Sequence, residues 1–281
     1  MCSRQEMNER RPFIINLMMH WTCLLLAVAL TSALPSTAQA DDERCRQDSS
    51  AVFVIQGEID DAMAACVEAL FQPTTTELLL DSRGGSVEAA ITIAQHFEGQ
   101  RLSMRVRKEC SSSCANYFLP LAGQLIVEPG ALIVIHGGAD PMLVEKMRGE
   151  GEPELIVAAL SQLAEQQMHF ARRNGIHPGW LLYRQSGQAS SNALDGDWEG
   201  ASTAIRAYVV EERMARSCLT GVEILPFQDS LDEGLLSPSR AQKLHQQGIA
   251  RSGSVVCNSM GWEDVIAPTR SAPAPPPALH R

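Results

Sequence analysis

The segment LLLDSRGGSVEAAI, residues 78–91, decides the fold class of this chain. Residues 78–80 form a short apolar run, which predicts a buried strand. Two adjacent glycines follow, and from Val87 onward the apolar residues recur at helical spacing. A buried strand that turns through glycine into a helix is the repeating unit of α/β folds. The segment therefore predicts an α/β fold with mostly parallel strands.

The neighbouring segments repeat this alternation of strand and helix. Residues 51–57 form an apolar run ended by glycine, and Asp60 and Asp61 follow it as caps for a helix. Residues 174–235 carry no clear pattern, and we expect an insert at about 175–226 within one α/β domain of residues 41–265. We expect further strands over residues 103–107, 125–127 and 132–135, and helices over residues 87–97, from the serine cluster to Leu121, 155–173 and 239–247.

The first forty residues have the composition of a secretory signal peptide. A positive segment with Arg4, Arg10 and Arg11 precedes an apolar stretch over about residues 21–34. The A-x-A sequence at residues 38–40 then precedes three acidic residues. This combination predicts export and cleavage after residue 40, and hence a periplasmic or secreted location.

An uncleaved transmembrane anchor is the alternative for this segment. A span needs about 20 apolar residues, and Asn16, His20 and Pro35 interrupt the stretch that would supply them. Neither Cys23 nor Cys45 follows a lipobox, which argues against a lipoprotein.

At the C-terminal end, residues 266–281 are rich in Pro and Ala, a composition typical of a disordered tail.

The charge of the chain argues against nucleic acid as a partner. The full sequence has a net charge of −10, and loss of residues 1–40, with three Arg and two Glu, leaves about −11. Such a charge repels phosphate backbones and anionic membranes. The roughly 240 residues that remain are enough for one large domain with a substantial core.

Six cysteines remain after cleavage, an even number that predicts disulfides in an oxidising compartment. Zinc is the rival partner for Cys110 and Cys114. No Cys-x2-Cys or His-x3-His set accompanies them, so we expect no metal site. Proximity in the chain favours the pairs Cys45–Cys66, Cys110–Cys114 and Cys218–Cys257.

Three segments hold residues that could carry chemistry. Gly84 and Gly85 could point N–H groups into a cleft to hold an oxyanion, although a tight turn is the simpler interpretation. The serine cluster at residues 111–113 could supply a nucleophile or simply cap a helix. His136 ends a buried strand and precedes two glycines that leave its ring accessible, although a lone histidine there is usually structural.

The order of these segments resembles the Clp protease/crotonase superfamily. LDSRGGSVEAAI resembles the Gly-Gly segment of the Clp proteolytic subunit and of related signal-peptide peptidases. The segment that carries the nucleophile in this family is similar to SCANYFL, which begins at Ser113. The strand end that carries the base in the family is similar to VIH, which ends at His136. The closest similarity is to predicted periplasmic Clp-like proteins, over roughly residues 50–140. It implies a spiral of ββα units with a mostly parallel sheet.

The resemblance also implies roles for particular residues. His136 would be the general base, and the N–H groups of Gly85 and Cys114 would hold the oxyanion. Spacing to the following aromatic residue favours Ser113 as the nucleophile, whereas the Cys-x-Ser-x-Cys pattern of other periplasmic relatives favours Ser112. Arg83 stands where the proteases carry proline, and Cys110 and Cys114 bracket the serines.

The resemblance also implies an acid as the third member of a catalytic triad. In the proteases, the acid precedes a Ser-x-x-x-Ala helix start by eight residues. Ser237 and Ala241 fit that start, which points to Asp229 as the acid, with Asp232 nearby. This requires an inserted segment after the histidine, and that segment holds Asp195 and Asp197 as alternatives.

The sequence therefore predicts an exported serine peptidase-like hydrolase that acts by nucleophilic acyl transfer on a peptide or protein, without a cofactor. A catalytically silent binding or assembly module on the same fold is the main alternative. A crotonase-type acyl-CoA enzyme is a second one, which export argues against because CoA is cytoplasmic. A homo-oligomer is compatible with the resemblance.

Export generates the first testable prediction. Because the A-x-A site ends at Ala40, mass spectrometry of the protein from an envelope fraction should find a mature N-terminus at Asp41. An intact Met1 in a membrane pellet would instead indicate an anchored protein.

Overall fold

A computed structural model describes residues 44–182, 207–227, 248–252 and 261–266, together with positions 244, 246 and 257. The expected signal peptide and nearly all of the expected C-terminal tail lie outside these residues, as does most of the helix expected over residues 239–247. Within the described part of the chain, no helix is both long and apolar enough to cross a membrane.

The described strands form one nine-stranded mixed sheet in which most neighbours are parallel. Strands β2, β3 and β4 run parallel in its centre, and β4 continues parallel to both β5 and β6. Only the pairs β1–β2 and β6–β7 are antiparallel in this sheet as described. The predicted α/β class with mostly parallel pairing is thereby confirmed. The strands are β1 (Cys45–Gln47), β2 (Val52–Ile59), β3 (Glu77–Gly85), β4 (Ser103–Ser111), β5 (Gln124–Val127), β6 (Leu132–Ile135), β7 (Ala207–Val209), β8 (Glu223–Ile224) and β9 (Ile249–Arg251).

The first helix begins at the Asp60 cap that the sequence predicted, and the second begins at a serine cap. The Asp60 carboxylate accepts a hydrogen bond from the Met63 N–H at 2.8 Å, and the Ser86 hydroxyl accepts one from the Ala89 N–H at 3.2 Å. The described helical segments are α1 (Asp61–Leu70), α2 (Val87–Gln95), η1 (Cys114–Phe118), η2 (Leu119–Leu121), α3 (Pro141–Gly149), α4 (Glu154–Arg173), α5 (Pro178–Leu181), α7 (Glu212–Cys218) and α9 (Trp262–Ile266).

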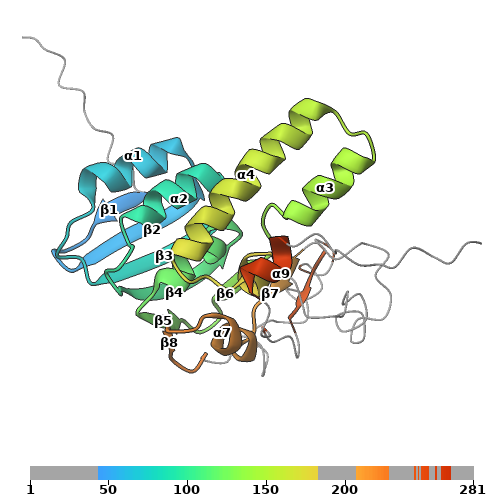
Figure 1. Ribbon diagram of the computed structural model, residues 1–281. Helices are drawn as coiled ribbons and strands as arrows, with labels where there is room; N and C mark the ends of the chain where they lie inside the picture. Colours follow the sequence, from blue (N-terminus) through green and yellow to red (C-terminus); the bar gives the residue numbers. More distant parts are fainter. Residues whose placement is uncertain are drawn as a thin grey trace, which may run out of the picture. The chain divides into compact units, whose positions relative to one another are not determined.

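Helices α1, α2 and α4 cover one face of the sheet, with α2 between the other two (Figure 1). Aromatic side chains join these layers: Phe97, two residues after α2, packs edge-on against Phe118, and Tyr117 packs edge-on against Phe170 of α4. All four rings are almost completely buried. The core therefore lies directly beneath η1, the helical segment that follows the serine cluster.

Two local features differ from the sequence-based expectation. The helix expected after the serines is a π-helix, η1, followed by a 3-10 turn, η2. Pro120 lies in that turn and cannot donate the backbone hydrogen bond that a continuing α-helix needs. Strand β4 also extends four residues beyond residue 107, to Ser111, because Glu109–Ser111 pair with β6.

Part of the expected insert belongs to the main sheet. Strand β7 pairs with β6, and β8 pairs with β5, although both lie within residues 175–226. The remainder of that range, from residue 183 to 206, lies outside the described residues.

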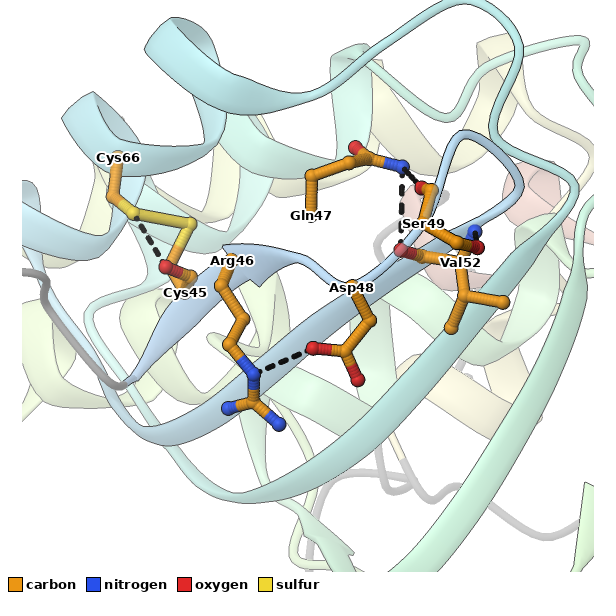
Figure 2. A network of polar contacts seen from close by, with 7 residues as sticks. All are labelled: Cys45, Arg46, Gln47, Asp48, Ser49, Val52 and Cys66. Atoms are coloured by element: carbon orange, nitrogen blue, oxygen red, sulfur yellow. Dashed lines mark hydrogen bonds and ion pairs between the residues drawn. A yellow bond between two sulfur atoms is a disulfide. The ribbon is translucent and has the colours of Figure 1, made fainter.

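All three expected disulfides, Cys45–Cys66, Cys110–Cys114 and Cys218–Cys257, are present in the structure. Figure 2 shows the first, which joins the short edge strand β1 to α1. On the same strand, Arg46 pairs with Asp48 at 2.7 Å, and the Gln47 amide donates to the Val52 carbonyl at 3.2 Å (Figure 2). These contacts explain how a three-residue strand that the sequence pattern did not indicate is held at the edge of the sheet.

The close packing of β3 against β2 generates a stability prediction. Gly85 has a φ of +153°, and a Cβ there would lie 2.1 Å from the Ile59 carbonyl oxygen. Gly85→Ala should therefore lower the free energy of unfolding by about 3 kcal/mol or more, as expected for a clash combined with backbone strain. Chemical denaturation would measure it.

Gly149→Ala is the matched control for this change. Gly149 ends α3, and a Cβ there would meet no atom within 4 Å. This substitution should leave stability unchanged or raise it by about 0.5–1 kcal/mol, since alanine favours helix. Equal losses in the two variants would contradict the packing described for Gly85.

Candidate functional site

A cleft of about 790 Å³ opens at the carboxyl ends of β2, β3 and β4. Parallel strands end together at this edge, which is where α/β proteins commonly bind ligands. The lining brings together the Gly-Gly segment and the serine cluster, which lie 26 or more residues apart in the sequence. The lining residues are Gln56, Gly57, Glu58, Asp81, Arg83, Gly84, Gly85, Lys108, Glu109 and Ser112.

Gly84 and Gly85 allow β3 to approach two other backbones at once. A Cβ on Gly84, which has a φ of +83°, would lie 2.5 Å from the Ser111 carbonyl oxygen and 2.8 Å from Ser112 Cβ. A Cβ on Gly85 would meet Ile59 of β2 on the other side. Both positions require glycine, and the pair places β3 against the serine cluster.

Ser112 lies in a sharp turn between β4 and η1. Its φ is +54°, a left-handed conformation that costs a non-glycine residue about 1–2 kcal/mol. Its N–H donates to the Val134 carbonyl at 2.8 Å, and its carbonyl accepts from the Asn116 N–H at 2.8 Å. A serine on a strained strand-to-helix turn is the arrangement that exposes the nucleophile in many hydrolases.

The structure brings Ser112 and His136 into direct contact. Ser112 Oγ lies 2.5 Å from His136 Nε2, within hydrogen-bond distance. Strand β6, which leads to His136, is the parallel neighbour of the end of β4, with Ser111 opposite Val134. The imidazole is exposed to solvent, and Ser112 is half-buried.

Ser113, which spacing favoured as the nucleophile, points elsewhere. Its hydroxyl is buried and donates to the Gly85 carbonyl at 2.6 Å, while the Gly85 N–H approaches the same Oγ at 3.3 Å. Ser111 is also engaged, since its hydroxyl donates to the Glu109 carboxylate at 2.6 Å. The geometry therefore selects Ser112, the other serine that the sequence left open, as the partner of His136.

The backbone donors expected at an oxyanion site are near Ser112 but partly occupied. The Gly84 N–H donates to Ser82 Oγ at 3.0 Å, and the Gly85 N–H makes the longer contact to Ser113 Oγ. With Ser112 as the nucleophile, the next residue is Ser113 rather than Cys114, and Gly84 packs against the Ser113 nitrogen. Cys114 is bonded to Cys110 and begins the π-helix.

The expected acid lies outside the described residues. This holds for Asp229 and also for the alternatives Asp195, Asp197 and Asp232. Among the residues that the structure describes, no carboxylate is hydrogen-bonded to the His136 ring.

Gln167 of α4 positions the loop after His136, a role that the sequence did not reveal. This fully buried side chain accepts a hydrogen bond from the Ala139 N–H at 3.2 Å and donates to the Ala139 carbonyl at 2.9 Å. Its Oε1 also accepts from the Tyr117 hydroxyl at 2.7 Å, which links α4 to η1. A glutamine on the buried face of an amphipathic helix was the signal that could have identified it.

The Tyr117 phenol stays protonated and can act as a donor in this network. Burial, and then the charge of Glu88, raise the pKa of Tyr117 above its usual range. On the other side of η1, the Trp180 indole N–H donates to the Ala115 carbonyl at 3.1 Å. Side chains of α4 and α5 thus both bond the π-helix, Gln167 at the Tyr117 hydroxyl and Trp180 at the Ala115 carbonyl.

No protein-family model matches the chain, and no curated protein matches it in sequence. The site is therefore interpreted from its geometry.

Within the described residues, no group of three or more His, Cys, Asp and Glu side chains is arranged to hold a metal ion. The cysteines for which zinc was the rival partner are joined in a disulfide.

The cleft carries charge of both signs. Lys108 pairs with Asp81 at 3.1 Å, and the exposed Arg83 guanidinium lies 3.4 Å from the Glu109 carboxylate. Glu58 adds a third carboxylate to the lining, at the position opposite Gly84 in the β2–β3 pairing. The charged side chains of this wall suit a polar ligand better than an apolar one.

The hydrogen bonds of Gln167 generate a prediction about stability. Gln167→Leu removes three hydrogen bonds, to the Ala139 N–H, the Ala139 carbonyl and the Tyr117 hydroxyl. We expect the free energy of unfolding to fall by about 3 kcal/mol, at roughly 1 kcal/mol for each bond lost. Denaturant unfolding monitored by circular dichroism would measure this.

Gln166→Leu is the control, because Gln166 is the exposed neighbour on the same helix. It should change the stability by less than about 0.5 kcal/mol. A similar loss in both variants would mean that the helix, rather than the buried amide, is responsible.

Proposed function

We propose that this chain is an exported, serine peptidase-like hydrolase that acts by nucleophilic acyl transfer. The observation that carries the proposal is the 2.5 Å contact between Ser112 Oγ and His136 Nε2. Ser112 also lines the cleft that Gly84 and Gly85 share. A hydroxyl paired with a base beside backbone donors is the minimal arrangement for covalent acyl transfer.

Each proposed group has a defined task in the reaction. Ser112 Oγ attacks the carbonyl carbon of an amide or ester, and His136 Nε2 takes the hydroxyl proton as general base. His136 then returns that proton to the leaving group as the tetrahedral intermediate breaks down. Water, activated by the same imidazole, releases the acyl group from Ser112 and restores the free hydroxyl.

Stabilisation of the oxyanion falls to the backbone around Gly84, Gly85 and Ser113. The Gly85 N–H is the best placed to change partner, because its 3.3 Å contact with Ser113 Oγ is long for a hydrogen bond. A developing negative charge attracts such a donor more strongly than a neutral hydroxyl does.

Two irregularities next to Ser112 support a functional rather than a purely structural site. One is the left-handed backbone of Ser112 itself. The other is the π-helix that follows, in which the buried Asn116 Oδ1 has no hydrogen-bond partner among the described residues. Strained backbone, π-turns and unsatisfied buried polar atoms are concentrated at functional sites.

A location outside the cytoplasm is part of the proposal. Three disulfides are consistent with folding in an oxidising compartment. Together with the predicted signal peptide, they support a periplasmic or secreted protein. The order of β3, the serine turn and β6 in a mostly parallel sheet supports a Clp-like core as the finer fold assignment.

A catalytically silent binding or assembly module is the second candidate. It is favoured by the exposed His136 ring, to which no described carboxylate is hydrogen-bonded. The N–H groups of Gly84 and Gly85 are also both engaged by serine hydroxyls. In such a module the same cleft would bind a peptide without cleaving it.

Labelling with a fluorophosphonate probe separates the two candidates. The wild-type mature protein should be labelled at Ser112, and Ser112→Ala should lose labelling completely because the attacking atom is gone. His136→Ala should lower the labelling rate by about 10²-fold or more, the range expected for a general base. Mass spectrometry of the labelled peptide identifies the modified serine.

Ser113→Ala is the matched control one residue away. It loses only the buried contacts with Gly85, so labelling should persist, although at a reduced rate. A wild-type protein that stays unlabelled while folded would refute the hydrolase and favour the silent module. Labelling that disappears with Ser113→Ala and survives Ser112→Ala would reverse the assignment of the nucleophile.

A further inference from the structure

The disulfide Cys110–Cys114 encloses the strained serine. Cys110 is the second-to-last residue of β4, and Cys114 is the first residue of η1. Ser112 is midway between them in the chain. The two Cα atoms are 5.3 Å apart, so the bond fixes the distance between the end of the strand and the start of the helix. The chain must reverse within this span, and Ser112 is the residue that takes the left-handed conformation.

Hydrogen bonds and the disulfide restrain this turn together. The Ser112 N–H and carbonyl are bonded to Val134 and Asn116, which orients the two peptide groups that flank it. Asn116, however, belongs to the π-helix η1, which begins at Cys114. The disulfide adds a second covalent link between that helix start and β4, besides the main chain that runs through Ser112.

We propose that the Cys110–Cys114 disulfide is a positioning element that keeps Ser112 Oγ against His136 Nε2. The inference rests on the proposed function, since it assigns the disulfide a part in the reactivity of that serine. Without the bond, the turn is free to relax to an ordinary right-handed conformation, which carries the hydroxyl away from the imidazole. Cys110 and Cys114 thereby act through Ser112 and touch no substrate themselves.

The burial of the bond makes it a permanent support rather than a switch. Both cysteines are completely buried in the core. Thiol–disulfide exchange requires access of a thiolate to one of the sulfurs. The folded protein should therefore keep the bond in the presence of soluble thiols, and the serine turn should be completed once, during oxidative folding outside the cytoplasm.

The chain offers a matched control in its disulfide Cys45–Cys66. That bond fastens the edge strand β1 to α1 (Figure 2), whereas the serine turn lies between β4 and η1. Removal of either disulfide should lower the unfolding temperature, because each closes a loop in the unfolded chain. Only removal of Cys110–Cys114 should change the reactivity of Ser112.

The experiment compares Cys110→Ala/Cys114→Ala with Cys45→Ala/Cys66→Ala in the full mature chain. The rate of fluorophosphonate labelling is measured well below both unfolding temperatures, with circular dichroism to confirm folding. We expect the first variant to label at least about tenfold more slowly than wild type, and the second to label at the wild-type rate within about twofold. Should the first variant not fold, Cys110→Val/Cys114→Ala fills the buried space with apolar atoms.

A second measurement tests the geometry without relying on catalysis. The ring nitrogen resonances of His136, recorded by NMR, report its contact with Ser112, and Ser112→Ala provides the reference for the lost contact. The Cys110/Cys114 variant should match Ser112→Ala, and the Cys45/Cys66 variant should match wild type. Wild-type ring signals and wild-type labelling in the folded Cys110/Cys114 variant would overturn the proposal. If wild type itself does not label, the hydrolase fails, and the NMR comparison still decides the role of the disulfide.

Discussion

The close approach of three backbones at Gly84 and Gly85 is the constraint on which the site depends. Strand β3 passes between Ile59 of β2 and the serine turn, with separations that leave no room for a Cβ on either side. Any side chain at these positions would push apart the strands that form the floor of the cleft. The same contact lets the Gly85 backbone receive the Ser113 hydroxyl, which ties the serine turn to β3.

Other features of the site follow from that approach. With Ser113 held by Gly85, Ser112 is the residue that must turn outward, and its left-handed backbone directs its hydroxyl to the end of β6. His136 reaches it because β6 runs parallel to β4, and the loop after His136 is fixed by the buried amide of Gln167. A strained serine is thus supported from several elements at once, as is usual where backbone strain persists.

Much of the fold was predictable because it depends on local signals. Alternating apolar runs and amphipathic stretches predicted β2 to β6, α1, α2 and α4, and Asp60 caps α1 as expected. Chain proximity predicted all three disulfides. The edge strand β1 was missed because three residues carry no periodicity, and the effect of Pro120 on the helix after the serines was overlooked.

Residue types and their periodicity indicate a mostly parallel α/β sheet, with glycines, serines and a histidine following particular strands. They left both Ser112 and Ser113 open as the partner of His136, since spacing to the following aromatic residue favoured Ser113 and the Cys-x-Ser-x-Cys pattern favoured Ser112. The tertiary structure shows that Ser112 contacts His136, because Gly85 accepts the hydrogen bond of the Ser113 hydroxyl and β6 pairs with the end of β4. Both are contacts between segments more than 20 residues apart, and sequence periodicity records only what is near along the chain.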